Sequence, residues 1–194
     1  MTSPDAHEGK DPVTIAIDAG ARLDALEIPW VTAGSVASSI HGEPRSTMDV
    51  DMVIGLASRD VKALAQALRG DYYVDVDAMH AAVKSSGSFN AVHVASMIKV
   101  DFFVAGDDPF EAERLASRFR VEMPSGALYV DTAEHTLLRK LEWYRRGGEV
   151  SERQWRDVQA IVRIQGDRLD HQRLRQWSGV LGVTDLLERL LGQV

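Results

Sequence analysis

Residues 34–54 read GSVASSIHGEPRSTMDVDMVI, a pattern that predicts a turn, a short helix, a polar loop and then a strand over residues 48–54. Because side chains alternate across a strand, Asp49 and Asp51 project from the same face of it. Two ionised carboxylates side by side repel each other unless a cation lies between them. Oxygen ligands at this spacing favour Mg²⁺ or Mn²⁺, so the strand predicts a metal site.

Gly34 and Ser35 stand between an expected strand, residues 30–33, and the start of an expected helix. The N-terminus of a helix exposes unpaired backbone N–H groups and the positive end of the helix dipole, and both favour phosphate. Gly34 would let the backbone approach a phosphate closely, and the hydroxyl of Ser35 would add a donor. Arg45 and Thr47 lie on the loop before the second strand, where they either orient the loop or contact a triphosphate.

A third carboxylate, Asp101, interrupts an apolar strand that is expected over residues 97–104. It shares one face of that strand with Lys99 and Phe103. A lone charge in an apolar strand needs a partner or a metal. The alternatives are therefore a catalytic carboxylate and a structural ion pair with Lys99 or Arg45.

If the two strands pair, Asp49, Asp51 and Asp101 converge on one site. Three carboxylates can hold two metal ions and align an attacking hydroxyl with the α-phosphate of a nucleoside triphosphate. Asp101 would also be placed to accept the proton of the nucleophile. All three are therefore candidate catalytic residues and candidate metal ligands.

The chain of 194 residues divides by pattern into three parts. Residues 1–12 are polar and acidic and predict a disordered tail. Residues 13–130 alternate between helix and strand patterns, whereas residues 131–194 carry helix patterns only. These patterns predict an α/β (α+β) fold, with a short mixed sheet flanked by helices and a C-terminal helical bundle. No Pro- or Ser-rich linker separates the two halves, so we expect them to pack as one unit with the nucleotide between them.

The composition narrows the classes of function. The net charge of −7 excludes a general nucleic-acid coat protein, because backbone binding needs a positive surface. No apolar run approaches the roughly 18 residues of a membrane helix, and the first residues lack the apolar segment of a secretory signal. The absence of cysteine excludes disulfides and thiolate metal sites and fits a reducing cytosol. We therefore expect a cytoplasmic protein that does not contact a membrane.

A Gly-Ser pair, about a dozen further residues, an Asp-x-Asp strand and a later strand Asp together resemble the DNA polymerase β-type nucleotidyltransferase superfamily. Within it, the chain resembles the AbiEii-like toxin nucleotidyltransferases, over roughly residues 30–165. Those relatives also carry a helical Lys-Leu motif and an Arg-Asp motif. Lys140 with the leucine after it, and Asp157 with the arginine before it, match these motifs. The relatives often have a second Asp where this chain has Ala160.

The resemblance implies that Lys140 contacts a nucleotide phosphate and that Asp157 supports Lys140. It also implies Mg²⁺-dependent transfer of a nucleoside monophosphate from a nucleoside triphosphate to tRNA or another RNA, or to a protein. Such an enzyme could be the toxin of a toxin–antitoxin pair, with an antitoxin as its partner.

Two other classes of function fit parts of the pattern. A non-catalytic nucleotide-binding or partner-binding module could retain the same fold, and an Asp-x-Asp pair also occurs in transferases that bind a metal and a nucleotide-sugar. Retention of all three carboxylates favours catalysis. We expect Trp143, Tyr144 and Trp155 to lie in the core between helices rather than to stack on a base, and His41 to have no chemical role.

Overall fold

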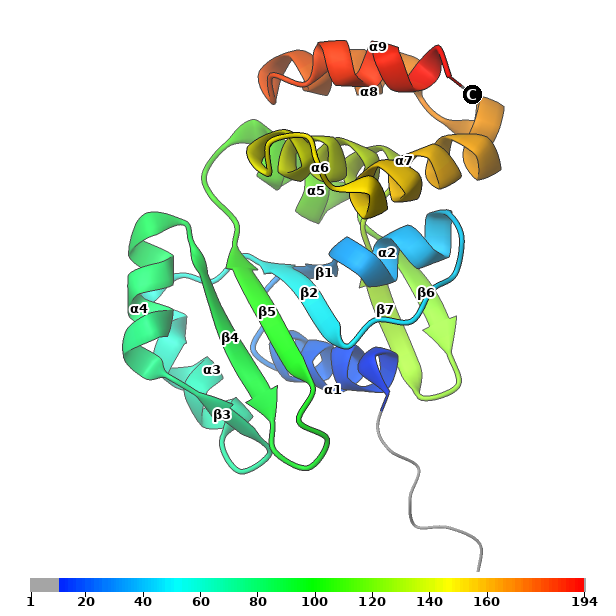
Figure 1. The fold of residues 1–194 in the computed structure, drawn as a ribbon. Coiled ribbons are helices and arrows are strands. Elements are labelled where there is room, and N and C mark those ends of the chain that lie inside the picture. The colour runs from blue at the N-terminus through cyan, green and yellow to red at the C-terminus, as the bar shows by residue number, and fades with distance from the viewer. Residues whose placement is uncertain (1–10, 194) are drawn as a thin grey trace, which may run out of the picture.

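The computed structural model describes residues 11–193 and contains a seven-stranded sheet flanked by helices (Figure 1). The strands are β1 (Trp30–Thr32), β2 (Asp49–Ile54), β3 (Tyr72–Val74), β4 (Ser88–His93), β5 (Lys99–Val104), β6 (Phe119–Met123) and β7 (Gly126–Val130). Their order in the sheet is β3-β4-β5-β2-β1-β7-β6. β2 runs parallel to β5 and β1 parallel to β7, whereas the other neighbouring pairs are antiparallel. The predicted mixed α/β fold is therefore confirmed.

The helices begin where the sequence offers a capping side chain or a turn. They are α1 (Pro12–Asp24), α2 (Gly34–His41), α3 (Val61–Leu68), α4 (Val76–Ser85), α5 (Pro109–Ser117), α6 (Ala133–Arg146), α7 (Glu152–Gln165), α8 (His171–Val180) and α9 (Thr184–Leu191). The side chains of Thr132 and Ser151 accept hydrogen bonds from backbone N–H groups in the first turns of α6 and α7. These caps fix where the two helices that face the sheet begin.

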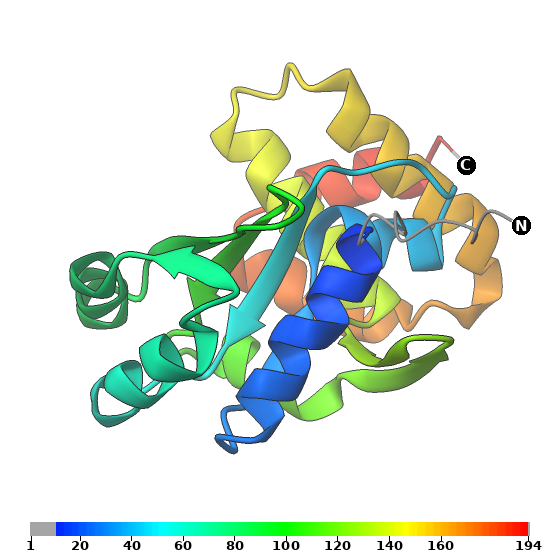
Figure 2. The same ribbon diagram turned by 90° about the horizontal axis from the view of Figure 1, so that it is seen from below.

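Two large hydrophobic clusters hold these elements together. One joins the sheet to helices α1 to α4 and includes Trp30 and Met52. The other joins α5 to α9 and includes Leu137, Leu141 and Ile161. Figure 1 places α2 between the sheet and helices α6 and α7. In Figure 2, which is seen from below, α1 lies in front of the sheet.

The pairing of β2 with β5 brings the predicted carboxylates together. The register sets Asp51 opposite Asp101 and Asp49 opposite Lys99. Val50 and Met52 of β2 are fully buried in the cluster below the sheet. Because side chains alternate, Asp49 and Asp51 therefore point to the other face, toward the C-terminal helices.

Helix α4 has no counterpart in the sequence prediction. Its residues carry only a weak apolar stripe, since Met79 and Ala82 are the helix's fully buried positions. The helix is nevertheless defined by Asp75, whose side chain accepts hydrogen bonds from the backbone N–H groups of Asp77 and Ala78. A cap without a strong periodic pattern is easily missed.

Of the predicted tail, residues 1–12, the first ten residues lie outside the described residues. Its last two positions belong to α1, because Asp11 caps the helix and Pro12 occupies its first position. The helix thus starts one residue before residue 13, where the α/β part was expected to begin. None of the helices within residues 11–193 combines the length and the hydrophobicity needed to span a membrane.

Candidate active site

A cavity of about 940 Å³ lies between the sheet and helices α6 and α7. Small-molecule sites usually have volumes of roughly 300–1,000 Å³, so this one could take a nucleotide. Every residue that the sequence analysis singled out for the site lines this cavity. These residues are Gly34, Ser35, Arg45, Thr47, Asp49, Asp51, Asp101, Lys140 and Asp157.

Gly34 is needed where it stands for two reasons. Its φ angle is +56°, a left-handed conformation that side chains rarely adopt. A Cβ atom added there would also lie 1.8 Å from Oδ2 of Asp51. The backbone N–H of the next residue, Ser35, donates a hydrogen bond to the same carboxylate. The turn therefore cradles a carboxylate of the site, in addition to the phosphate role that the sequence suggested.

The carboxyl group of Asp51 is held in an unfavourable environment. Burial raises its pKa above the ordinary value, and the negative charges of Asp101 and Asp49 raise it further. The N–H of Ser35 and the positive charge of Lys140 oppose this shift only in part. An ionised Asp51 would be stabilised by a cation, which is the situation that the sequence predicted for this strand.

Arg45 and Lys140 reach the site from two different segments and meet at Asp157. The guanidinium of Arg45 donates to Oγ of Ser35 at 2.5 Å and lies 3.3 Å from Oδ2 of Asp157. Nζ of Lys140 lies 2.7 Å from that same oxygen. Lys140 is buried, which lowers its pKa, while the hydrogen bond to Asp157 raises it. Asp157 thus holds both cations beside the turn at Ser35.

Thr47 contacts its own loop. Its Oγ1 donates to the backbone carbonyl of Asp49 at 3.0 Å. This hydrogen bond fixes the loop as it enters β2, and the residue still lines the cavity. The contact favours an orienting role for Thr47.

Asp101 has a partner in this structure. Nζ of Lys99 lies 2.7 Å from its Oδ2, and both residues share the predicted strand face. The pair is partly exposed to solvent, with side-chain exposures of 40% for Lys99 and 23% for Asp101. A partly exposed ion pair of this kind contributes little stability, and Asp101 also lines the cavity, so its catalytic role stays a prediction.

The carboxylates fit a metal that arrives with its substrate. Within residues 11–193, no group of three His, Asp or Glu side chains is gathered closely enough to hold an ion by itself. Mg²⁺ is commonly bound by one or two carboxylates together with the phosphates of the substrate. Asp49 and Asp51 on one strand face match that arrangement. The role of Asp101 as a third metal ligand stays a prediction.

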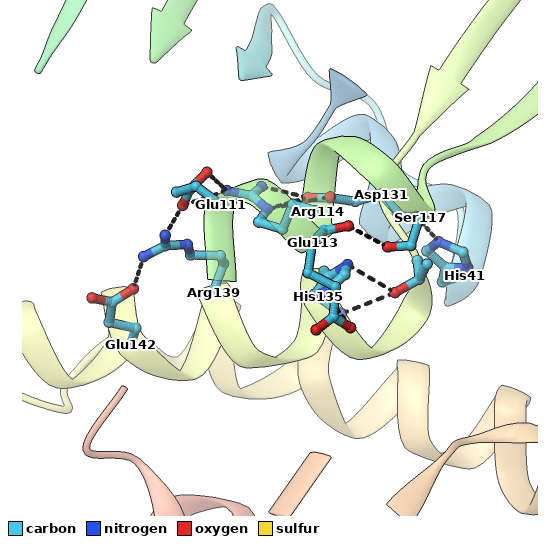
Figure 3. Close-up of polar contacts among 10 residues, drawn as sticks. His41, Glu111, Glu113, Arg114, Ser117, Asp131, His135, Arg139 and Glu142 are labelled. Carbon is cyan, nitrogen blue, oxygen red and sulfur yellow. Dashed lines mark hydrogen bonds and ion pairs between the residues drawn. The ribbon is translucent and has the colours of Figure 1, made fainter. Parts of the chain in front are cut away.

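A buried ion cluster closes one side of the cavity and ties α5 to α6 and to the end of β7 (Figure 3). The guanidinium of Arg114 lies 3.2 Å from a carboxylate oxygen of Glu111 and also binds the carboxylate of Asp131. Arg139 pairs with Glu111 and with Glu142. The cluster fixes Arg139, and with it the neighbouring turn of α6 that carries the lysine of the site.

His41 belongs to the same junction. Its Nε2 lies 2.6 Å from the backbone carbonyl of Asp131, so the buried imidazole joins the end of α2 to the end of β7. Burial lowers the pKa of His41, which favours the neutral ring. A structural role follows, as the sequence analysis expected. Ala160 is also buried, in α7, and does not line the cavity.

Part of the cavity wall is formed by residues that were not named from the sequence, and one of them is an aromatic residue that was expected elsewhere. Arg139, Trp143 and Arg146 line the cavity from α6, and Arg153 lines it from α7. Their spacing of four and three residues along α6 marks one helical face, a signal that was available in the sequence. The expectation that Trp143 lies in the core is wrong, because its side chain is 49% exposed.

Neither a protein-family model nor a curated protein sequence matches the chain. Solved structures do share its fold. An antigenic nucleotidyltransferase-like protein from Paracoccidioides brasiliensis has a TM-score of 0.56 at 16% identity, over 93% of this chain and 92% of that one. The antibiotic-resistance factor ANT(2″)-Ia with adenylyl-2″-tobramycin has a TM-score of 0.54 at 14% identity, over 87% and 95% of the two chains. The chain therefore has a nucleotidyltransferase fold.

Proposed function

We propose that this protein is a metal-dependent nucleotidyltransferase that moves a nucleoside monophosphate from a nucleoside triphosphate to a hydroxyl group. The observation that carries the proposal is the single cavity that all the sequence-predicted site residues line. Three carboxylates, a Gly-Ser turn and two cations line it, from both halves of the chain. This combination suits a polyanionic substrate that is delivered with a divalent metal.

The residues divide into two roles in this proposal. Ser35, Arg45 and Lys140 bind the β- and γ-phosphates, and Asp157 keeps the two cations in place. Asp49 and Asp51 would hold Mg²⁺ or Mn²⁺, which neutralises phosphate charge when bound. The carboxylate of Asp101 accepts the proton of the acceptor hydroxyl as its oxygen bonds to the α-phosphorus. The bond from the α-phosphorus to the bridging oxygen then breaks, and pyrophosphate leaves.

The acceptor follows from the resemblance to AbiEii-like toxins, which supports RNA, including tRNA, or a protein. The same resemblance supports a toxin that is paired with an antitoxin. A small-molecule acceptor has its own support, because the similar structure of ANT(2″)-Ia contains adenylyl-2″-tobramycin. Two alternatives, a binding module without catalysis and a nucleotide-sugar transferase, both predict that no label is transferred from a nucleoside triphosphate.

The proposal is tested by label transfer. The protein is incubated with each α-labelled nucleoside triphosphate, Mg²⁺ and, in turn, total RNA, a protein extract and tobramycin. We expect label to appear on one acceptor class with the wild type, and to be lost in the Asp49→Ala/Asp51→Ala variant. Equal transfer by the two proteins would contradict the assignment. Triphosphate binding without any transfer would favour the binding module.

The same variant must be shown to fold. Because the pKa of Asp51 is raised in the folded state, ionising it lowers the stability as the pH rises through that raised value. At neutral pH and without metal, the double variant should therefore melt no earlier than the wild type. An early melting curve would show instead that the two carboxylates support the fold.

Gly34→Val should weaken triphosphate binding more strongly than Ser35→Ala. Valine would be strained at a φ of +56° and would collide with Asp51, displacing both the turn and the carboxylate. Ser35→Ala removes one hydroxyl and should cost about 1 kcal/mol of binding free energy. Calorimetric titration with a non-hydrolysable triphosphate and Mg²⁺ measures both.

A matched control for the backbone strain is Gly182→Val. Gly182 also has a positive φ, +66°, but a Cβ atom there meets nothing within 4 Å. It lies outside the cavity lining. This variant should lose stability and keep triphosphate affinity. If Gly34→Val binds as well as this control, the phosphates lie elsewhere.

A further inference from the structure

Trp143 is packed differently from the other tryptophans. Trp30 and Trp177 are buried in the two large clusters, and Trp155 packs against the second. Trp143 belongs to none of the clusters and is 49% exposed. Burying a tryptophan contributes strongly to folding, so an exposed indole in a cavity wall gives up that contribution. An exposed aromatic ring in the wall of a ligand cavity indicates that part of the ligand packs against it.

Two neighbours hold the ring of Trp143 in the cavity wall. The ring of Phe103 meets it edge-on, with centroids 6.4 Å apart and an interplanar angle of 62°. The guanidinium of Arg146, one helical turn further along α6, lies over the indole at 5.4 Å from its centroid, so a base would stack on the opposite face. Both neighbours also line the cavity. An indole that is supported at its edge and by a cation is held in one orientation.

Trp143 lies near two residues that are proposed to bind the phosphates or to act at the α-phosphate. Trp143 follows Lys140 by three residues on α6, so the two side chains lie on one face of the helix. Phe103, which touches Trp143, follows Asp101 by two residues on one face of β5. A nucleotide with its terminal phosphates at Lys140 and its α-phosphate near Asp101 therefore carries its ribose and base toward the indole.

We propose that Trp143 is the stacking platform for the base of the nucleoside triphosphate. This inference rests on the proposed function and adds the residue that recognises the base. Stacking on an aromatic ring tolerates every base, because each has a π-face. Trp143 thus contributes affinity for nucleotides as a class, and base selection falls to other groups.

The test compares a nucleotide with a ligand that has a chain of three phosphates but neither base nor ribose. A non-hydrolysable ATP analogue and inorganic tripolyphosphate, each with Mg²⁺, are titrated into wild type, Trp143→Ala and Trp143→Phe. Trp143→Ala should bind the ATP analogue roughly tenfold more weakly, the scale of one lost base–aromatic stack, and bind tripolyphosphate unchanged. Trp143→Phe should restore most of the affinity for the analogue, because phenylalanine keeps a ring face.

Tyr73→Ala is the matched control. Tyr73 is 72% exposed on β3 and does not line the cavity, so its removal should leave both affinities unchanged. A second readout is the tryptophan fluorescence, which the ATP analogue should quench in the wild type but far less in Trp143→Phe. Tripolyphosphate should leave it unchanged.

The outcomes separate this inference from the proposed function. If the wild type binds both ligands and Trp143→Ala binds them equally well, the platform is refuted and the nucleotide site stands. An equal loss of both ligands in Trp143→Ala would also refute it, since the indole would then shape the phosphate end. If the wild type binds neither ligand, the proposed function fails and the platform fails with it.

Discussion

Asp101→Asn should lower the rate of nucleotidyl transfer by about 100-fold or more, the scale of losing a general base. Asparagine keeps the shape of the side chain but cannot accept the proton of the attacking hydroxyl. Affinity for the triphosphate should fall much less, because Asp49, Asp51 and the Ser35 turn remain. The measurement is a single-turnover transfer rate and a dissociation constant on the same protein.

Lys99→Met is the control that separates chemistry from structure. It breaks the 2.7 Å ion pair but leaves the carboxylate of Asp101 in place. If Asp101 is catalytic, Lys99→Met should retain most of the rate that Asp101→Asn loses. If the ion pair is what matters, the two variants should behave alike, and melting curves should show the same loss of stability. Full activity in Asp101→Asn would show that Asp101 is not catalytic and has a structural role.

Arg114→Met should reduce the free energy of unfolding by about 3–5 kcal/mol, the range for breaking a buried ion pair from one side. Arg114 is 4% exposed, and its removal takes the cation from the buried carboxylate of Asp131 and leaves Glu111 with Arg139 alone. Urea denaturation, followed by circular dichroism, measures the loss. Activity should fall as well, because the cluster fixes the turn of α6 that carries Lys140.

Arg120→Met provides the comparison for that loss. Arg120 pairs with Glu122 at the surface, where the two side chains are 55% and 69% exposed. Exposed pairs contribute about 0–1 kcal/mol, so this variant should unfold almost as the wild type does. A similar, small effect in Arg114→Met would show that water reaches the cluster around Arg114.

Much of the site could be predicted from the sequence because its signals are local. Alternation along residues 49–54 is enough to place Asp49 and Asp51 on one face of a strand. The turn at Gly34-Ser35 is likewise recognised within a few residues. The side chains of Thr132 and Ser151, which cap α6 and α7, are local signals of the same kind.

Other features depend on residues that are distant in the chain. The parallel pairing that sets Asp51 opposite Asp101 joins positions 50 residues apart. From the sequence, the convergence of the carboxylates could be predicted only on the assumption that the two strands pair. Gly34 carries no sign that its missing Cβ makes room for Asp51. The meeting of Arg45 with Asp157 is equally invisible, because a polar loop and a helix have no pattern that relates them.

Trp143 and Arg114 show most clearly why the tertiary structure was needed. Large aromatic side chains are usually buried, so the sequence placed Trp143 in the core, whereas on α6 it lines the cavity. Arg114 lies on the short helix α5, and no local pattern of that helix shows that it is buried between the carboxylates of Glu111 and Asp131. The sequence by itself determined which groups could do the chemistry, through local alternation, turns and caps. Only long-range packing decided which side chains are buried and which face the cavity.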